Sequence, residues 1–568
     1  MLAQLHTDIL VLGSGGAGLF AALHAKQADP RLSVTVAVKG LLGKCGCTRM
    51  VQGGYNVALA QGDSVERHFM DTIEGGKWLP DQDLAWKLVT LAVERIHELE
   101  NELGCFFDRN PDGTVHQKAF AGQTFDRTVH KGDLTGIEII NRLAEQVWAR
   151  DIGRLEEHRA VELVRAADGD GIAGVLFIDM RTGEYRFVRA RAVLLATGGG
   201  PTMYKYHTPS GDKSCDGLAM ALRAGLALRD MEMVQFHPTG LLAGTHTRMT
   251  GTVLEEGLRG AGGYLLNGDK ERFMSRYDAK GERATRDIVS RAMFAEMRAG
   301  RTTPNGGLYI SMQHLERAEV GRQFKGMVER CADCGFDLAG GLVEVVPTAH
   351  YMMGGVEFRA DCSTSLRGLY VAGEDSGGVH GANRLGGNGV ANSTVFGAVA
   401  GDTMAAHARD LPLRAPDRAA IDAAIARCER PFSAPGGNVN EVREALYELM
   451  WDKVGIIRSG ADLRAARERL QALRDALAAS GIRDATRAYN LTWHDRLNLE
   501  NLLEVSAAIT AAALAREDSR GAHFREDFPE AGPLERSAYT SVRQVEDELV
   551  VAMKPVAFTR VRPGESLL

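Results

Sequence analysis

The chain has 568 residues, of which 45% are hydrophobic and 25% are charged, and its formal net charge is -7. This length exceeds one typical hydrophobic core and implies several domains, and the composition is that of an ordinary globular protein. The negative charge gives no basic surface for nucleic acid, and no apolar run is long enough to span a bilayer, so the sequence excludes nucleic-acid-binding and transmembrane classes.

The N-terminal residues predict a nucleotide-binding turn. Residues 8–12 form an apolar strand, residues 13–18 read GSGGAG, and residues 19–23 continue with helical character. In this motif the glycines allow a tight turn, the approach of a pyrophosphate to the helix N-terminus, and close packing of helix on strand. We therefore expect the ligand to contact Gly13, Gly15, Gly16, Ala17 and Gly18.

Three further stretches extend this site. The second predicted strand, residues 34–38, ends at Lys39, where many such folds carry an acidic residue for the adenosine ribose. Residues 191–200 (RAVLLATGGG) and 368–374 (GLYVAGE) each predict a buried strand that ends in glycine. Together the strands outline one FAD-binding domain whose pieces are far apart in the sequence, with Glu374 available to bind ribose hydroxyls.

Two glycine-framed loops late in the chain predict a site for an anion. PTAHYMMGG contains His350, and HGANRLGGN contains Arg384. A guanidinium stays protonated and matches a carboxylate with two hydrogen bonds, while glycine lets the backbone approach a flat cofactor. We expect an anionic substrate beside the cofactor.

The eight cysteines are scattered and fit a reducing compartment. Cys331 and Cys334 form a lone CxxC, whereas a tetrahedral zinc or iron-sulfur site needs two more ligands at comparable spacing. We therefore expect no metal in this chain, and any iron-sulfur centre that exchanges electrons with it lies on another polypeptide.

Thirteen motifs follow one another along the chain: GSGGAG, QGG, DTIEGGKWLPDQ, ATGGG, CDGLAMALRAG, MEMVQFHPTG, EEGLRGAGGYLLN, TRDIVSRA, PTAHYMMGG, GLYVAGE, HGANRLGGN, MWDKVGIIR and LAREDSRGAHFREDFP. In this order they resemble the flavoprotein subunit of the succinate dehydrogenase and fumarate reductase family, which includes L-aspartate oxidase. This resemblance implies FAD, an inserted capping domain, and hydride transfer between flavin N5 and a four-carbon dicarboxylate.

The expected fold class is α/β. A Rossmann-like FAD-binding domain carries an inserted α+β capping domain and is followed by a helical domain and a small β-rich C-terminal tail. Amphipathic segments such as 464–479 predict the helices, and residues 539–545 and 549–556 predict strands. The predicted boundaries are 1–233 and 351–415 for the FAD-binding domain, 234–350 for the capping domain, 416–530 for the helical domain and 531–568 for the tail.

The resemblance also implies roles for individual residues. His237, His350 and Arg384 match positions that bind the substrate carboxylates, and Glu255 stands beside them. Arg286 matches the proton donor, and Glu256 and Arg259 match the relay that returns its proton. The residues implied to contact FAD beyond the glycine turn are Lys39, Cys47, Thr48, Gln52, Gly53, Gly54, Ala196, Thr197, Gly198, Asp216, Glu374, Arg384 and Asn388.

Two departures from the family pattern affect the expected chemistry. The family commonly has Thr-Glu-Gly where this chain has Glu255-Glu256-Gly257, and an ionised carboxylate cannot donate a hydrogen bond. Beside a substrate carboxylate it would repel by about 4 kcal/mol at about 4 Å with an effective dielectric constant of about 20. Either Glu255 is protonated, or it turns away, or the substrate presents another group there, such as a substituted or partly neutral dicarboxylate.

The second departure is at the flavin. Cys47 stands in the run Gly46-Cys47-Thr48, where membrane-bound members have a histidine that bonds covalently to the flavin. We therefore expect a dissociable FAD, with a thioether to Cys47 as the alternative.

Other functions stay open at this point. An L-aspartate oxidase-like enzyme with oxygen or fumarate as acceptor also lacks the flavin-linking histidine, and a non-catalytic electron-transfer flavoprotein would share the fold. The run from Arg516 to Pro529 matches a segment near which an iron-sulfur subunit docks in the family, so we expect such a partner. The N-terminus lacks the features of an export signal, so we expect a cytoplasmic location, with peripheral attachment to the inner face of the membrane through partner subunits.

Overall fold

A computed structural model describes residues 2–244 and 247–568. Its largest sheet has seven strands in the order β6-β2-β1-β9-β8-β7, with β16 also paired to β9. The pairs β1·β2, β1·β9, β2·β6 and β9·β16 are parallel, whereas β8 runs antiparallel to both β7 and β9. The strands are β1 (Ala3–Leu12), β2 (Val34–Ala37), β6 (Gly153–Leu155), β7 (His158–Arg165), β8 (Ile172–Asp179), β9 (Tyr185–Leu195) and β16 (Leu369–Val371).

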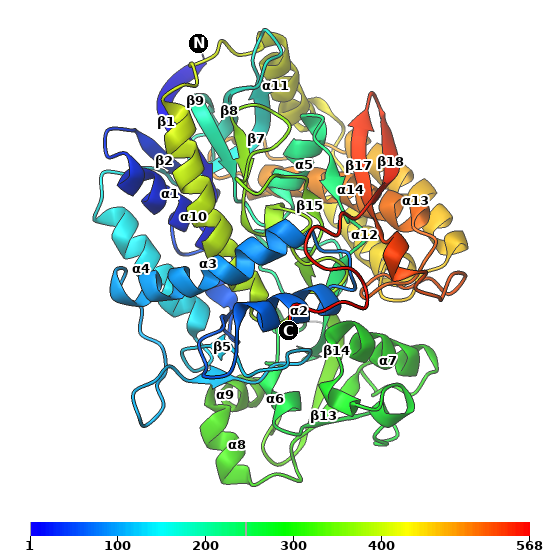
Figure 1. Cartoon of the computed structure of the whole chain (residues 1–568). Coiled ribbons are helices and arrows are strands. Elements are labelled where there is room, and N and C mark those ends of the chain that lie inside the picture. The colour runs from blue at the N-terminus through cyan, green and yellow to red at the C-terminus, as the bar shows by residue number, and fades with distance from the viewer. Residues whose placement is uncertain (1, 245–246) are drawn as a thin grey trace.

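Two apolar helices pack together against this sheet. Helix α1 (Gly16–Ala28) lies along α10 (Asn388–Ala408), although the two are far apart in the sequence (Figure 1). Glycines on α10 permit the close approach, because a Cβ at Gly397 would lie 2.6 Å from the carbonyl oxygen of Ala17. The first 223 residues also contain four further helices and a small sheet. The helices are α2 (Val65–Gly75), α3 (Gln82–Asn101), α4 (Thr135–Trp148) and α5 (Asp216–Arg223), and the sheet has the order β3 (Tyr55–Asn56), β5 (Thr128–Val129) and β4 (Gln117–Lys118).

Residues 234–244 and 247–352 form a second body, drawn in green at the bottom of Figure 1. Its residues between Leu241 and Val345 have a core of their own, whereas the two ends of this stretch pack in the core of the large sheet. Its antiparallel sheet has the order β11-β14-β13-β12. Buried Leu265, Met293, Ile310 and Met327 fill the space between this sheet and its helices. The elements are β11 (Val234–Leu241), α6 (Gly257–Gly260), β12 (Tyr264–Leu266), α7 (Arg286–Arg298), β13 (Leu308–Ser311), α8 (Arg317–Gln323), α9 (Lys325–Asp333) and β14 (Leu342–Met352).

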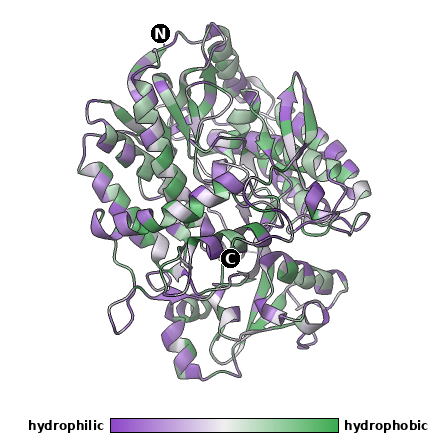
Figure 2. Ribbon diagram, in the orientation of Figure 1, coloured by the Kyte–Doolittle hydropathy of each residue, from purple (hydrophilic) through white to green (hydrophobic). Residues whose placement is uncertain are grey.

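Four helices, α11 to α14, follow α10 in the chain, and each begins after a residue whose side chain caps the helix backbone. Asp417, Asn438, Ser459 and Asn490 each accept a hydrogen bond from an amide of the first turn, which satisfies a donor that has no partner within the helix. In α13 the buried residues Leu463, Ala466, Leu470, Leu473 and Leu477 lie on one face, whereas α14 is buried along most of its length. Figure 2 shows hydrophilic and hydrophobic residues mixed along the ribbon. The helices are α11 (Arg418–Ser433), α12 (Val439–Lys453), α13 (Gly460–Ala479) and α14 (Leu491–Ala515).

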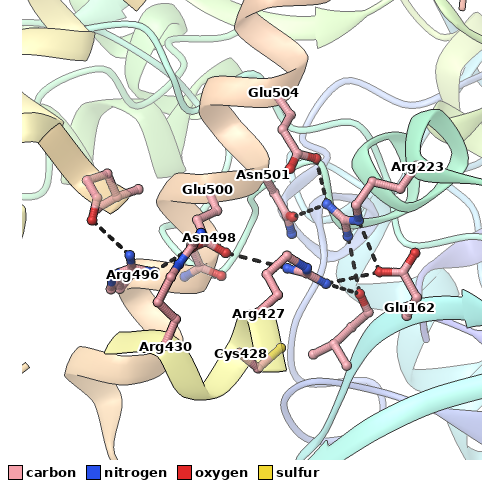
Figure 3. A network of polar contacts seen from close by, with 12 residues as sticks. Glu162, Arg223, Arg427, Cys428, Arg430, Arg496, Asn498, Glu500, Asn501 and Glu504 are labelled. Atoms are coloured by element: carbon pink, nitrogen blue, oxygen red, sulfur yellow. Dashed lines mark hydrogen bonds and ion pairs between the residues drawn. The ribbon is translucent and has the colours of Figure 1, made fainter. Parts of the chain in front are cut away.

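A network of ion pairs joins these helices to the large sheet (Figure 3). Glu162 on β7 accepts from Arg223 of α5 at 3.2 Å and from Arg427 of α11 at 3.0 Å. Arg223 also pairs with Glu504 of α14, and Arg427 pairs with Glu500 on the same helix at 3.4 Å. The shared partners fix the helical region against the sheet that carries the nucleotide motif.

The two C-terminal strands extend the small sheet that contains β15 and β10. Strands β17 (Ala538–Val545) and β18 (Glu548–Pro555) form a hairpin, and β17 also pairs with β10 (Leu228–Arg229), which pairs with β15 (Gly355–Val356). The chain end then returns to α3, where the Gln82 side chain bonds to the backbone of Val561 at 2.7 and 3.0 Å. No helix within the described ranges is long and apolar enough to cross a membrane. Short 3-10 helices occupy Cys47–Met50, Met274–Arg276, Gly281–Arg283, Gly373–Asp375 and Leu534–Arg536.

Candidate active site

A cavity of about 810 Å³ runs from the glycine turn after β1 to the sheet of the second body. Its walls combine segments that are distant in the sequence, including the β1–α1 turn, residues 44–54, the end of β9, and β11 and β14. Of the residues singled out from the sequence, the cavity is lined by Gly13, Gly15, Gly16, Ala17, Lys39, Cys47, Thr48, Gln52, Gly53, Gly54, Ala196, Thr197, Gly198, Asp216, His237, Glu255, Glu256, Arg286, His350, Glu374 and Arg384.

The glycine turn forms a narrow backbone cradle at one end. Gly13 has φ +110°, and a Cβ there would lie 2.1 Å from the carbonyl oxygen of Ala196, so only glycine fits. Helix α1 begins at Gly16, whose amide donates to the Thr48 hydroxyl at 3.1 Å. The start of a helix presents free amides and a partial positive charge, so this end of the cavity suits a phosphate group.

An ion pair stands at the end of β2, where the sequence lacks an acid. Lys39 Nζ lies 2.7 Å from a carboxylate oxygen of Asp216 and also donates to Ser214. Burial raises the pKa of Asp216, but the charges of Lys39 and Arg159 outweigh burial and hold that pKa below its usual range. The ionised carboxylate of Asp216, at the start of α5, therefore lines the cavity at this point.

Glu374 lies farther along the same wall and is fixed by the backbone. One carboxylate oxygen accepts from the amide of Met352 at 2.9 Å and from that of Gly200 at 3.3 Å. Burial raises the pKa of this carboxyl. Its position ties the segment that follows β16 to the end of β14 and to the loop after β9.

Two arginines meet at the other end of the cavity around a glutamine. Gln235 on β11 accepts from Arg286 Nη1 and from Arg384 Nη2, each at 3.1 Å, through its Oε1 atom. Its amide nitrogen donates to the backbone oxygen of Arg384 at 2.8 Å. Arg384 also lies over the ring of Tyr351, with its guanidinium carbon 4.4 Å from the ring centroid. Sequence reasoning did not single out Gln235.

Two histidines face the same space. The rings of His237 and His350 have centroids 5.5 Å apart, and each is held through Nδ1, by the amide of Thr239 at 3.3 Å and the hydroxyl of Thr208 at 2.8 Å. Burial and the charge of Arg286 keep the pKa of both imidazoles well below the usual value. The low pKa values favour the neutral form of both rings, and within the described residues only their Nδ1 atoms have hydrogen-bond partners.

An ion pair lies behind these groups. Glu256 Oε2 accepts two hydrogen bonds from Arg286, at 2.6 Å from Nη2 and 2.8 Å from Nε. Burial raises the pKa of Glu256, but the charges of Arg286 and Arg259 outweigh burial and hold that pKa below its usual range. Arg259 lies 3.7 Å from the other oxygen and donates to the backbone of Glu282 at 2.7 Å. The three side chains form a continuous buried row that leads away from the cavity.

Glu255 does not turn away from the cavity. Its side chain is 3% exposed and lines the wall, and its Oε1 accepts from Lys118 Nζ at 3.1 Å. Burial, Asp133 and Glu256 raise the pKa of Glu255, and Lys118 opposes the rise. Lys118 lies on the short strand β4, in a stretch without a recognisable motif, and sequence reasoning did not single it out.

Three of the singled-out residues lie outside the cavity wall. Gly18 supports the turn, because a Cβ there would lie 2.0 Å from the carbonyl oxygen of Gly13. Arg259 stands behind Glu256, as described above. Asn388 is buried at the start of α10, where it bonds to Asn56 and His68 at 2.9 Å and to Thr72 at 3.1 Å.

Cys47 lines the cavity, and burial raises the pKa of its thiol to about 12. In the part of the chain that the structure describes, all eight cysteines are free, and no group of three or more His, Cys, Asp or Glu side chains is arranged to hold a metal ion.

Comparison with known proteins places the chain among flavoproteins. The FAD binding domain family matches residues 8–390, and the fumarate reductase flavoprotein C-terminal family matches residues 443–567. The chain is similar to one subunit of the fumarate reductase (CoM/CoB) of Methanothermobacter marburgensis, with 40% identity over 96% of this chain and 98% of that protein. It is 34% identical to the fumarate reductase flavoprotein subunit of Escherichia coli over 92% of this chain and 88% of that protein.

Solved structures agree with these relationships. A quinol-fumarate reductase solved with menaquinol molecules superposes with a TM-score of 0.92 at 31% identity, covering 99% of this chain and 100% of that one. The Rossmann-like α/β class expected from the sequence is confirmed by this match. The chain belongs to the succinate dehydrogenase and fumarate reductase family of FAD-binding flavoproteins.

Proposed function

We propose that this protein transfers a hydride between FAD and a four-carbon dicarboxylate, fumarate and succinate or a substituted relative. The observation that supports this most directly is the shared cavity. The same hollow contains the glycine cradle at one end and the guanidinium groups of Arg286 and Arg384 at the other. A nucleotide cofactor and a small dianion would therefore lie next to each other, as a two-electron exchange requires.

The residues of the long wall fit FAD. The amides at the start of α1 suit the pyrophosphate of FAD. Because Gly13 has no side chain, the turn can pack against Ala196 and stay open to the pyrophosphate. Asp216 and Glu374 provide carboxylates that we assign to hydroxyl groups of the cofactor. FAD supplies the hydride donor and acceptor of the reaction. We also propose that it is held without a covalent bond and that the predicted domain boundaries describe how the chain is divided.

We assign the carboxylates of the substrate to the cationic end. Arg384 is buried and keeps one guanidinium nitrogen, Nε, without a hydrogen-bond partner among the described residues. Burial and the charge of Arg286 lower its pKa to about 10, so it stays protonated at neutral pH. Arg384 and His350 would hold one carboxylate and His237 the other, through charge-assisted hydrogen bonds.

We assign the proton transfer to Arg286. A guanidinium has a high pKa, so it acts as a donor only where neighbouring groups return its proton. Glu256 accepts two hydrogen bonds from Arg286 and lies 3.7 Å from Arg259, so it is placed to pass a proton between them. The row would protonate one alkene carbon while the hydride adds to the other.

We also propose an iron-sulfur partner subunit. Two relatives are named as subunits of fumarate reductases, and the match to their C-terminal family includes the segment from Arg516 to Pro529. In this structure Arg516, Arg520 and Arg525 are buried and bind neighbouring carboxylates, so the segment also braces the fold. Such a partner would attach the protein to the cytoplasmic face of a membrane.

The test is a panel of acids added to the purified flavoprotein. The protein is reduced with dithionite without oxygen, and fumarate and substituted four- to six-carbon unsaturated acids are added while the flavin absorbance is followed. Reoxidation by one of these acids is the expected result. Failure of every acid to change the flavin spectrum would instead support an electron-transfer flavoprotein.

A second measurement separates the remaining alternative. An L-aspartate oxidase-like enzyme would reduce its flavin with aspartate and release hydrogen peroxide in air. Under the present proposal aspartate leaves the flavin oxidised.

A further inference from the structure

Glu255 places a carboxylate in a wall where an anionic substrate would lie. It immediately precedes Glu256, the partner of Arg286, and lines the same cavity as His237, Arg286 and Arg384. Because it is almost fully buried, it cannot escape into solvent, and its ion-pair partner Lys118 holds it at 3.1 Å. A dicarboxylate bound to Arg286 and Arg384 would therefore share the cavity with the Glu255 carboxylate.

An ion pair with Lys118 alone would favour the ionised form of Glu255, but the other groups around this carboxyl favour its neutral form. Lys118 also donates to the backbone oxygen of Gly132 at 2.9 Å, so it is already partly satisfied without Glu255. Asp133 and Glu256 are negative neighbours, and Glu256 is kept ionised by Arg286. Burial of the carboxyl acts in the same direction as these two charges. The other charged and titratable groups that line the cavity wall on the second body and its neighbouring loops are His237, Arg286, Arg330, His350 and Arg384. Arg259 stands behind Glu256, outside the wall.

We propose that Glu255 binds the substrate as a neutral carboxylic acid, taking up one proton from solvent when a dicarboxylate enters the cavity. The protonated group then donates its O–H to a substrate carboxylate, as the threonine expected at this position would do. This step is a proton transfer and changes no oxidation state. Lys118 loses its charged partner and keeps its bond to Gly132. The inference rests on the proposed function, because it requires a dicarboxylate ligand.

Proton uptake makes the affinity depend on pH in a defined direction. The dianion raises the pKa of Glu255 further, so the complex binds one more proton than the free protein over the interval between the two pKa values. Within that interval the affinity falls by about tenfold for each unit of rising pH. Below the interval Glu255 is already neutral, and the affinity no longer changes through this group.

Calorimetry measures the uptake without relying on catalysis. Malonate is a suitable probe, because it has two carboxylates and no CH–CH bond to oxidise. Its binding to the FAD-loaded protein is titrated in buffers that differ in ionisation enthalpy, between about pH 6 and about pH 9. We expect uptake that approaches about one proton per malonate in part of this range.

Variants assign the proton to Glu255. Glu255→Gln keeps the shape and a hydrogen-bond donor but cannot titrate, so its uptake falls to what the histidines contribute. Lys118→Met removes the cation that favours the ionised form, so the uptake interval moves to higher pH. Glu329→Gln is the matched control, since this carboxylate lies on α9 with 65% of its side chain exposed. We expect it to behave like the unchanged protein.

The outcomes are distinguishable. Malonate binding with the same proton uptake in the unchanged protein and in Glu255→Gln would overturn this inference and leave the proposed function intact. A preference for acids that carry a hydroxyl or amino group, lost in Glu255→Gln, would also overturn it, because Glu255 would then act as an ionised acceptor. If neither malonate nor any acid of the panel binds, the proposed function fails first.

Discussion

Gln235 holds Arg384 by two hydrogen bonds, one from the guanidinium to its amide oxygen at 3.1 Å and one from its amide nitrogen to the arginine backbone at 2.8 Å. The same oxygen accepts from Arg286, also at 3.1 Å. Two like charges are thereby kept at a fixed separation by a neutral group. Gln235 is a positioning residue for both the proposed carboxylate clamp and the proposed proton donor.

Replacement of Gln235 by methionine tests this role. Methionine has a similar length but no amide, so both guanidinium groups lose their shared acceptor and shift within the cavity. Because small displacements of reacting groups slow catalysis strongly, we expect kcat/KM for the best acid to fall by about 10- to 100-fold. The FAD content stays unchanged, which flavin absorbance per protein checks. A variant with normal kcat/KM would show that the arginines hold their positions without Gln235.

Arg286→Gln tests the proton donor. Glutamine can donate a hydrogen bond but cannot supply a proton, so we expect turnover to fall by about 100- to 10000-fold, as for loss of a general acid. Arg298→Gln on the exposed end of the same helix, where the side chain is 51% exposed, is the control and retains normal turnover. Malonate still perturbs the flavin spectrum of Arg286→Gln. Unchanged turnover would assign the proton to another group.

Gly13→Ala tests the nucleotide cradle. The added methyl group meets the backbone of Ala196 at 2.1 Å and the backbone has φ +110°, so we expect a loss of about 2 to 6 kcal/mol, the sum of strain and overpacking. Gly113→Ala is the control, since it has φ +87° with nothing within 4 Å of the new atom and pays only for backbone strain. Chemical denaturation compares the two. Equal losses would mean that contact with Ala196 is harmless.

The nucleotide half of the site could be predicted because its signals are local. The strand, glycine turn and helix at residues 8–23 are adjacent in the sequence, and each glycine has a steric reason that any chain would share. The strands ending in ATGG and VAGE carry the same signature, and they pair in parallel in the structure, with Leu369 beside Val193. Family resemblance then supplied the order of the pieces.

Gln235 and Lys118 could not be predicted, for different physical reasons. Every residue of β11 is buried, and its pairing with β14 shifts register after Gln235 and again after His237. Such bulges re-aim side chains, so the alternation of a regular strand does not indicate which of them face the cavity. Lys118 meets Glu255 across 137 positions of sequence, and its neighbours show no pattern that marks the contact.

Non-covalent FAD is tested by denaturing the purified protein and sedimenting it. Cys47 has the position of the flavin-linking histidine, but burial raises the pKa of its thiol to about 12, and a protonated thiol is a weak nucleophile. We therefore expect the yellow colour in the supernatant. A yellow pellet that becomes colourless in Cys47→Ser would establish a thioether instead.

The pH dependence of catalysis tests the state of the histidines. Free imidazole groups titrate near pH 6.5, but the pKa values of His237 and His350 lie well below this because of burial and the charge of Arg286. A depressed imidazole pKa means that the neutral ring persists as the pH falls through 6.5, so neither histidine contributes an inflection there. His350→Gln removes a hydrogen bond to a charged ligand, so kcat/KM should fall by about 10- to 100-fold. The shape of its pH profile should match that of the unchanged protein, because glutamine replaces a ring that was already neutral. An inflection near pH 6.5 that disappears in this variant would show that His350 is protonated during catalysis.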